Sequence, residues 1–244
     1  MEPSPSELER LVRYCHPAKI LAATRLPGSL DDAALAALYG VPVERYREVA
    51  GSLRCPALAA LDGLALGDSH TDDLGSWAEL LGLVNAGLSG DTSTGALARL
   101  HGLPAADRVY VLLGTNDARR HGDGPMLVSH RETRRNLRAI DRALGKVTWI
   151  TPPPVDEARV RRDPWLAEAG VAWRLADVAV KAAIVRDEFA DAIDLWPLFG
   201  PEHLAADGLH PSPAGQRLIA DAVLANRRSS QPTANEVSSA AGKR

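Results

Sequence analysis

The chain has 244 residues, of which 45% are hydrophobic and 24% are charged, and its formal net charge is -3. This length can bury a sizeable core, and the slightly acidic balance argues against bulk nucleic-acid binding. The longest apolar stretch, residues 56–66, is interrupted by Asp62 and is too short to span a bilayer. Residues 1–7 lack the basic and apolar regions of a signal peptide, so we expect a cytoplasmic protein without a membrane span.

The first 58 residues are expected to form a helical extension. Residues 30–46 predict two short helices joined at Gly40, a spacing similar to that of a helix-turn-helix. A DNA-reading unit needs a basic face, but residues 1–60 carry equal numbers of basic and acidic residues. We therefore expect no nucleic-acid partner, and instead a helical cap that shapes a pocket or mediates a homo-oligomer contact. Cys15 and Cys55 are too few and too widely spaced for a disulfide framework, so free thiols are expected.

Residues 59–228 alternate short apolar runs with helical patterns. Strands are expected at about 63–66, 83–86, 109–113, 147–151 and 192–195, and helices at about 77–81, 132–144, 172–186 and 214–225. This alternation predicts a parallel sheet, because parallel neighbours need crossover helices. Residues 155–165, with Arg159, Arg161 and Arg162, are expected to be a mobile loop whose arginines are solvated or clamp an anionic group. Residues 229–244 are rich in Ser, Ala and Asn and predict a disordered tail.

Two fragments far apart in the chain carry residues suited to nucleophilic catalysis. The first is Gly67-Asp68-Ser69, and the second is Asp207-Gly208-Leu209-His210. A serine hydroxyl needs a histidine to take its proton, and that histidine needs a third group to fix its tautomer. Ser69, His210 and Asp207 could fill these roles if the fold brings them together. Each fragment alone is a weak signal, since both are ordinary turn sequences.

Two segments between these fragments strengthen the hypothesis. Residues 85–93 and 114–117 each follow a strand-like apolar run, so Gly90 and Asn116 are expected on loops at the same sheet edge as Ser69. Acyl transfer develops an oxyanion that preorganised donors stabilise. A glycine N–H at position 90, the Asn116 amide and the N–H of Ser69 could supply these donors.

In these four ordered blocks the sequence resembles the SGNH (GDSL-type) hydrolases, which are named for Ser, Gly, Asn and His. Residues 84–93 are most similar to the thioesterase I, lysophospholipase and arylesterase branch, and the resemblance covers about residues 60–227. It implies a flavodoxin-like α/β/α sandwich with about five parallel strands. It also implies catalytic Ser69, Asp207 and His210, with an oxyanion hole formed by Ser69, Gly90 and Asn116. Gly87 is a less favoured alternative to Gly90.

His70 departs from the family pattern, which usually has leucine at this position. It is expected to be partly exposed beside the cleft, or else to contact substrate. With Asp68, Asp72, Asp73, Asp91 and Asp117, it could also belong to a two-metal phosphoesterase site. The later blocks do not fit that family, which would want a histidine where this chain has Asp117. We therefore expect neither metal nor cofactor, and we expect Asp68 and Asp117 to brace their loops.

The resemblance implies a serine hydrolase that cleaves an ester or thioester of a small molecule through an acyl-enzyme. Two alternatives remain at this point. An acyltransferase would use the same acyl-enzyme while excluding water, and a binding protein could keep the four blocks without turnover. The acyl donor and its chain length depend on loops that the sequence does not resolve.

Overall fold

A parallel four-stranded sheet forms the centre of the protein in the computed structural model, which describes residues 3–14, 31–53 and 56–229. Its strand order is β2-β1-β3-β5. The strands are β1 (Leu64–Gly67), β2 (Val84–Gly87), β3 (Val109–Leu112) and β5 (Val147–Ile150). Cys15, Cys55 and residues 230–244 lie outside the described residues.

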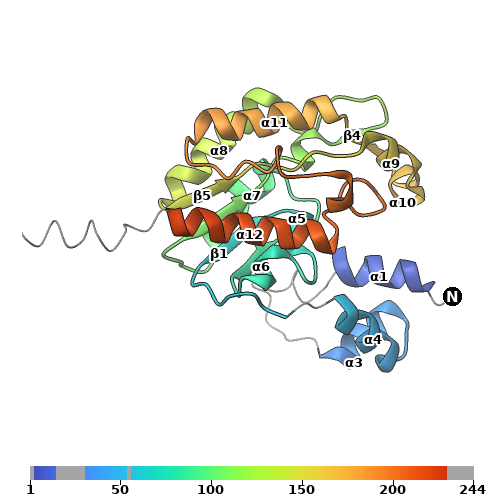
Figure 1. The fold of residues 1–244 in the computed structure, drawn as a ribbon. Helices are drawn as coiled ribbons and strands as arrows, with labels where there is room; N and C mark the ends of the chain where they lie inside the picture. Colours follow the sequence, from blue (N-terminus) through green and yellow to red (C-terminus); the bar gives the residue numbers. More distant parts are fainter. Residues whose placement is uncertain (1–2, 15–30, 54–55, 230–244) are drawn as a thin grey trace, which may run out of the picture.

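Helices cover both faces of the sheet (Figure 1). One face packs against α6 (Trp77–Leu80) and α12 (Pro213–Ser229), and the other against α7 (Ser93–Arg99), α8 (His130–Leu144) and α11 (Leu175–Glu188). The strands alternate accordingly, since Ala65, Tyr110 and Leu112 face the first layer, and Leu64, Leu66, Val109 and Val111 face the second. The expected three-layer flavodoxin-like sandwich is confirmed.

The fifth expected strand, at residues 192–195, is reduced to a single bridge. Ile193 pairs with Ile150 in parallel, through the contacts of Thr151 N–H with the Ile193 carbonyl (3.0 Å) and of Ile193 N–H with the Trp149 carbonyl (2.8 Å). This segment adds a fifth position beside β5. The resulting strand order is that of flavodoxin-like sheets, in which the first strand lies between the second and the third. The chain turns away after it, because the Trp196 indole donates to the Pro152 carbonyl.

Residues 155–165, expected to be a loop, instead form two short helices. These are α9 (Glu157–Arg162) and α10 (Pro164–Glu168), and the loop prediction was therefore wrong. Asp156 and Asp163 cap them by accepting from backbone N–H groups, and Pro164 sits at the first helical position of α10. Arg159 pairs with the capping Asp156, Arg161 pairs with Glu157, and Arg162 donates to the Ala158 carbonyl.

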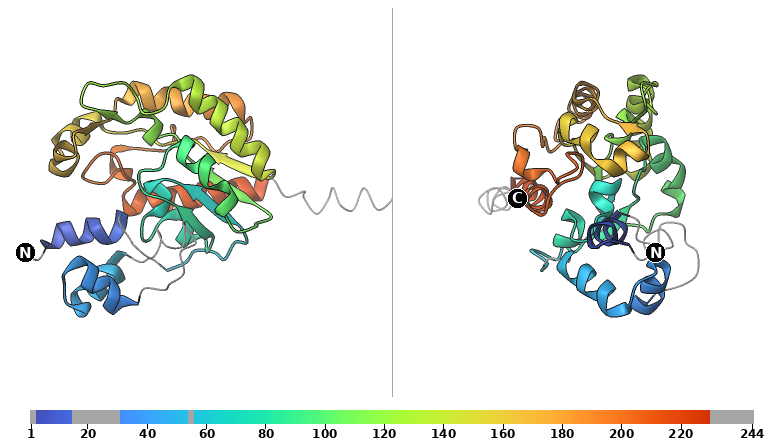
Figure 2. Two further views of the ribbon diagram at one scale, coloured as in Figure 1. Left: turned by 180° about the vertical axis from the view of Figure 1, so that it is seen from behind. Right: turned by 90° about the vertical axis from the view of Figure 1, so that its right-hand side faces the viewer.

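The N-terminal extension contains α1 (Pro5–Tyr14), α3 (Asp32–Tyr39) and α4 (Val43–Leu53), which lie together at one end of the sandwich (Figures 1 and 2). The two short helices joined at Gly40 are confirmed, with Gly40 left-handed at φ 67°. Leu8, Val12 and Tyr46 are buried in a shared apolar cluster. This cluster includes Leu74, which follows shortly after Gly67-Asp68-Ser69 in the chain. The extension therefore packs directly onto the sheet domain.

Several short elements connect these strands and helices. They are α5 (Ser69–Asp72), three 3-10 turns at Leu100–Gly102, Asn116–Ala118 and Pro201–His203, and an antiparallel pair of β4 (Arg120–His121) with β6 (Val171–Ala172). No helix in the described ranges is long and apolar enough to cross a membrane.

The packing of α1 gives a stability prediction. Leu8 is 0% exposed, whereas Leu38 on α3 is 61% exposed. Leu8→Ala should lower the free energy of unfolding by about 2–5 kcal/mol, because it leaves a cavity in the shared cluster. Leu38→Ala is the matched control and should change it by no more than about 0.5 kcal/mol. Denaturant unfolding of both variants measures the difference, and equal effects would mean that α1 is not packed as described.

Candidate active site

Ser69 lies in the first turn of α5, directly after β1. Asp68 caps this turn, since one of its carboxylate oxygens accepts from the His70 N–H at 3.0 Å. The other oxygen of Asp68 is buried and has no hydrogen-bond partner among the described residues. Burial raises the pKa of Asp68 to about 7. Asp68 therefore braces the turn that carries Ser69, and among the described residues only one of its two oxygens is used.

The structure brings His210 and Asp207 to Ser69. The His210 Nε2 atom lies 3.1 Å from Ser69 Oγ, and its Nδ1 atom lies 2.7 Å from an Asp207 carboxylate oxygen. The second Asp207 oxygen accepts from the backbone N–H groups of Leu209 and His210 at 2.9 and 3.0 Å. Burial would raise the pKa of Asp207, but the hydrogen bonds from His210 and Leu209 outweigh it and hold the pKa below its usual range.

The loop that carries Asp207 and His210 is fixed from two sides. The Asp156 N–H, at the start of α9, donates to the Gly208 carbonyl at 2.7 Å, and the Ala205 N–H donates to the His210 carbonyl at 2.8 Å. Backbone contacts therefore hold the loop independently of the side chains that it presents. The imidazole keeps its orientation because both the ring and its loop are restrained.

Gly90 and Asn116 lie on the two loops that flank the Ser69 turn. These loops leave β2 and β3, which pair with β1 on either side. Gly90 has a φ of 79°, and the space beside its Cα is open apart from one guanidinium nitrogen of Arg119. The Asn116 side chain is buried and makes no hydrogen bond with another described residue. Its amide is therefore available to a ligand.

Gly87, the less favoured candidate, has a packing reason to be glycine. A Cβ at this position would lie 2.4 Å from the Asp72 N atom, so a side chain cannot fit between β2 and α5. The close approach of the two backbones explains this residue, which leaves Gly90 as the better candidate for an oxyanion donor.

Asp117 ties the two flanking loops together, which bears out its expected bracing role. Its carboxylate accepts from the Ser93 N–H at 2.7 Å, the Ser93 hydroxyl at 2.6 Å and the Thr133 hydroxyl at 2.5 Å. Lys181 is fully buried behind it, with Nζ donating to Thr133 Oγ1 at 2.8 Å and to the Val128 carbonyl at 2.7 Å. Burial lowers the pKa of Lys181 to about 8, partly offset by Asp117 and Asp177. This network fixes Asn116 relative to the Gly90 loop.

His70 is buried, although we expected it to be partly exposed. The residue is 1% exposed, and its ring meets that of His210 edge-on, with centroids 5.7 Å apart and planes at 76°. Neither ring nitrogen makes a hydrogen bond of normal geometry. Burial, together with the nearby His210, lowers the pKa of His70 to about 3 despite weaker opposing effects of Asp207 and the Leu209 backbone. His70 is thus neutral, and its ring packs against that of His210.

The carboxylates proposed for the alternative two-metal site are engaged elsewhere. Asp72 accepts from the Ser89 N–H and hydroxyl, Asp91 pairs with Arg99 at 2.8 Å, and Asp73 pairs with Arg13 at 3.2 Å. Asp117 is committed to Ser93 and Thr133. Within the described part of the chain, these side chains point into separate contacts and do not converge on one point.

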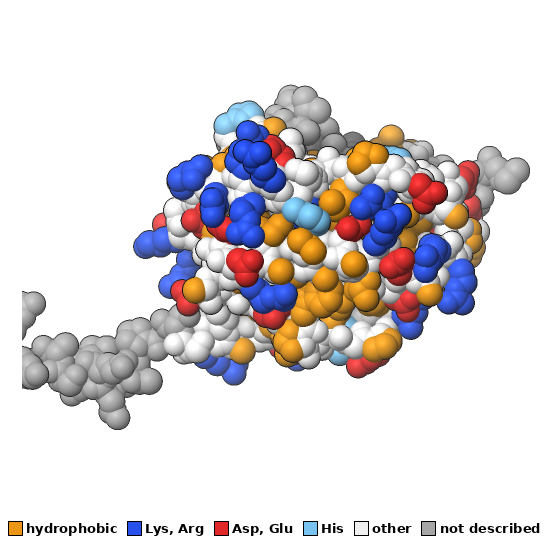
Figure 3. All heavy atoms as spheres, turned by 90° about the horizontal axis from the view of Figure 1, so that it is seen from above, with side chains coloured by type: hydrophobic (Ala, Val, Ile, Leu, Met, Phe, Trp, Pro, Cys, Tyr) orange, Lys and Arg blue, Asp and Glu red, His pale blue; other side chains and the backbone are white. Residues whose placement is uncertain are grey.

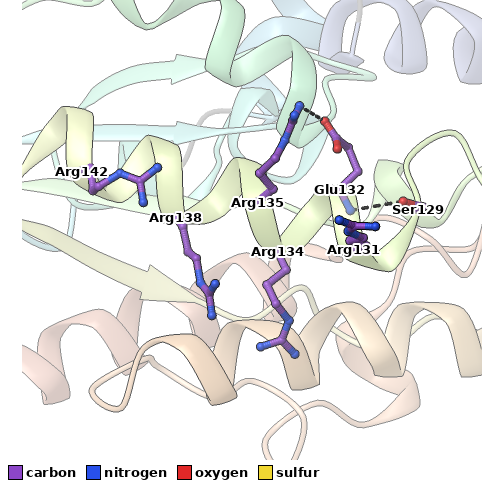
Figure 4. Close-up of a pocket in the computed structure, with 7 residues that line it drawn as sticks. All are labelled: Ser129, Arg131, Glu132, Arg134, Arg135, Arg138 and Arg142. Atoms are coloured by element: carbon purple, nitrogen blue, oxygen red, sulfur yellow. Dashed lines mark hydrogen bonds and ion pairs between the residues drawn. The ribbon is translucent and has the colours of Figure 1, made fainter.

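A second group of polar side chains lies on α8, away from Ser69. Its hollow is lined by Ser129, Arg131, Glu132, Arg134, Arg135, Arg138 and Arg142 (Figure 4). Arg134 and Arg138 point toward α11, where both pair with Glu188, and Arg135 pairs with Glu132. Basic and acidic side chains are interspersed on this side of the molecule (Figure 3). The arginines therefore form a solvated face.

Sequence reasoning missed two buried polar residues that support the site. Gln216 on α12 accepts from the Trp77 N–H and donates to the His70 carbonyl and Asp73. Lys181 supports Asp117 from α11. Both interrupt apolar helix faces, since Gln216 precedes Ile219 and Val223 at helical spacing, and Lys181 lies between Val178 and Val185. A polar residue among the apolar positions of one helix face was therefore the signal by which the sequence could have revealed them.

Comparison with known proteins places this geometry in a family. The sequence profile of the GDSL-like lipase/acylhydrolase family matches residues 65–218. The isoamyl acetate-hydrolyzing esterase 1 homolog of Bos taurus is 29% identical over 192 residues, which cover 64% of this chain and 77% of the relative.

Solved structures show the same fold. The lipase/acylhydrolase of Enterococcus faecalis is 25% identical with a TM-score of 0.56, and the match covers 69% of this chain and 95% of that protein. The enzyme LAE5 from the metagenome of Lake Arreo is 23% identical with a TM-score of 0.51, over 69% of this chain and 96% of its own. The chain belongs to the GDSL-like lipase/acylhydrolase family and is an esterase.

Proposed function

We propose that this esterase cleaves small carboxylic esters through a Ser69-His210-Asp207 triad and an acyl-enzyme. The observation that carries the proposal is the continuous chain of hydrogen bonds from Ser69 Oγ through His210 to Asp207, with distances of 3.1 and 2.7 Å. A base within 3.1 Å of the hydroxyl can accept its proton. The depressed pKa of Asp207 keeps this carboxylate charged, so it can stabilise the imidazolium that forms.

The reaction proceeds in two displacements. Ser69 Oγ forms a bond to the carbonyl carbon while its proton moves to His210 Nε2, and the carbonyl electrons move onto the oxygen. That oxyanion is stabilised by the N–H groups of Ser69 and Gly90 and by the Asn116 amide. Collapse breaks the bond to the alcohol, which takes the proton from His210. Water then repeats the sequence and releases the acid.

The substrate that we favour is an ester with a short acyl group. The Bos taurus relative is named for the hydrolysis of isoamyl acetate, and we propose an acetyl or similarly short ester here. A thioester would react by the same steps, with a thiol as the leaving group. An acyltransferase would differ in one measurable respect, because an added alcohol or amine would then turn over the acyl-enzyme faster than water does.

Replacement of the nucleophile tests the mechanism. Ser69→Ala should lower kcat on 4-nitrophenyl acetate by about 10³-fold or more, because the acyl-enzyme can no longer form. Ser52→Ala, at an exposed position on α4, is the control and should keep full activity. Thermal melting of both variants checks the fold. Equal rates for Ser69→Ala and the parent would rule out the serine mechanism.

The oxyanion hole can be tested separately. Asn116→Ala should lower kcat by about 10²- to 10³-fold while KM changes little, because the amide acts on the charge that develops in the transition state. The Asn116 side chain makes no hydrogen bond with another described residue, so its removal should not disturb the loop. Steady-state kinetics on the same ester give the two constants. A rise in KM at unchanged kcat would instead assign Asn116 to ground-state binding.

The role of His70 follows from its burial. We propose that it packs behind His210 without touching substrate, in which case His70→Leu should leave KM within about threefold. The variant should also melt at the same or a higher temperature, because it removes two buried nitrogens that lack good hydrogen bonds. Kinetics and thermal melting measure both effects. A KM increase of about tenfold or more would instead make His70 a substrate contact.

A further inference from the structure

Arg119 places a positive charge beside the proposed oxyanion hole. It follows the 3-10 turn that carries Asn116, and its Nη1 atom lies 3.6 Å from the position that a Gly90 Cβ would occupy. No other atom outside the neighbouring residues lies within 4 Å of that position. The guanidinium therefore borders the open space next to Gly90.

The backbone at Arg119 is held at both ends. Its N–H donates to the Asn116 carbonyl at 3.1 Å, and its carbonyl accepts from the Leu127 N–H at 2.9 Å. The side chain thus starts from a fixed point on the same turn as Asn116.

The Arg119 side chain is half-buried and has no partner within the described residues. It makes no ion pair or hydrogen bond there, and its Nε atom is buried without an acceptor. Burial lowers its pKa, with no carboxylate close enough to offset this effect. A partly desolvated cation without a counter-charge is costly, and such groups are usually paired.

Two neighbouring arginines show the usual arrangement. Arg99 pairs with Asp91 at 2.8 Å and donates to the Gly67 carbonyl. Arg120 pairs with Asp177 at 2.8 Å and donates to the Gly124 carbonyl. Asp91 and Asp177 are thereby occupied, and among the described residues Arg119 has no such partner and borders the open space beside Gly90.

We propose that Arg119 binds an anionic group of the ester substrate, a carboxylate or a phosphate that lies a few bonds from the scissile carbonyl. The planar guanidinium offers paired N–H donors that match either group. The proposal rests on the proposed function and deepens it by naming the substrate class. It requires that the ester carry a negative charge on its acyl or its alcohol part.

Pairs of esters that differ in charge test the proposal. On the acyl side, charged 4-nitrophenyl hemisuccinate is compared with neutral 4-nitrophenyl pentanoate. On the alcohol side, charged 4-acetoxybenzoate and 4-acetoxyphenyl phosphate are each compared with neutral phenyl acetate. The readout is the ratio of kcat/KM for the charged ester to that for the neutral one. In Arg119→Gln this ratio should fall by about tenfold or more in at least one set, mainly through KM, because one charge-assisted contact is lost.

Two further variants control for the result. Arg119→Lys keeps the positive charge but loses the paired N–H donors of the guanidinium. Its ratio of kcat/KM for charged over neutral ester should lie between those of the parent and Arg119→Gln. Arg131→Gln removes an exposed arginine on α8 and should leave the ratio unchanged. The two arms of the alcohol-side set distinguish carboxylate from phosphate. An unchanged ratio in Arg119→Gln for every set would overturn the proposal, including the case in which charged and neutral esters lose rate equally.

A binding measurement separates this proposal from the triad mechanism. Inorganic phosphate, succinate and 4-acetoxybenzoate are titrated calorimetrically into Ser69→Ala, with and without Arg119→Gln. Binding of at least one of these anions should weaken by about tenfold when Arg119 is replaced. This result does not depend on turnover, so it stands even if Ser69 is not the nucleophile. Equal affinity in the two proteins would overturn the role of Arg119 alone.

Discussion

The hydrogen bond between His210 and Ser69 joins residues that are 141 positions apart, and the rest of the site depends on it. It forms because β1 delivers Ser69 to the carboxyl edge of the sheet and because the loop before α12 returns to that same edge. Parallel pairing of β1 with β2 and β3 then sets the flanking loops on either side. The geometry of the site is thus a consequence of strand order, since parallel strands end at one edge.

The N-terminal extension restrains both halves of this contact, and we propose that it serves as a cap. Arg13 on α1 pairs with Asp73, directly after the α5 turn that carries Ser69, at 3.2 Å. One helical turn earlier, Arg10 holds Asp163 through two hydrogen bonds, and Asp163 is the residue that joins α9 to α10. The residue before α9, Asp156, donates its N–H to the Gly208 carbonyl. Helix α1 therefore contacts both the turn that carries Ser69 and the helices that hold the His210 loop.

The sequence predicted what depends on local periodicity and missed what depends on distant contacts. Short apolar runs at β1 and β3 predicted the sheet, and the four blocks gave Ser69, Gly90, Asn116 and His210 as candidates. Residues 155–165 carry no helical pattern in the sequence, because each helix there is only five or six residues long and depends on an aspartate cap. The burial of His70 was not visible either, because it is created by His210 and by Gln216 from α12. The contacts that bury His70 come from residues about 140 positions later in the chain, so the sequence around His70 does not reveal them.

Two carboxylates beside the same serine show how environment divides their roles. Asp68 and Asp207 are both buried, and burial alone raises the pKa of each. Asp207 receives hydrogen bonds from His210 and two backbone N–H groups, which more than offset burial, whereas Asp68 receives one and its pKa remains at about 7. Asp207 therefore keeps its charge where Asp68 is partly protonated, and it is the carboxylate that contacts His210 Nδ1. Asp68 loses its proton around neutrality, so the charge around Ser69 changes with pH even though the turn that Asp68 caps needs only one accepting oxygen.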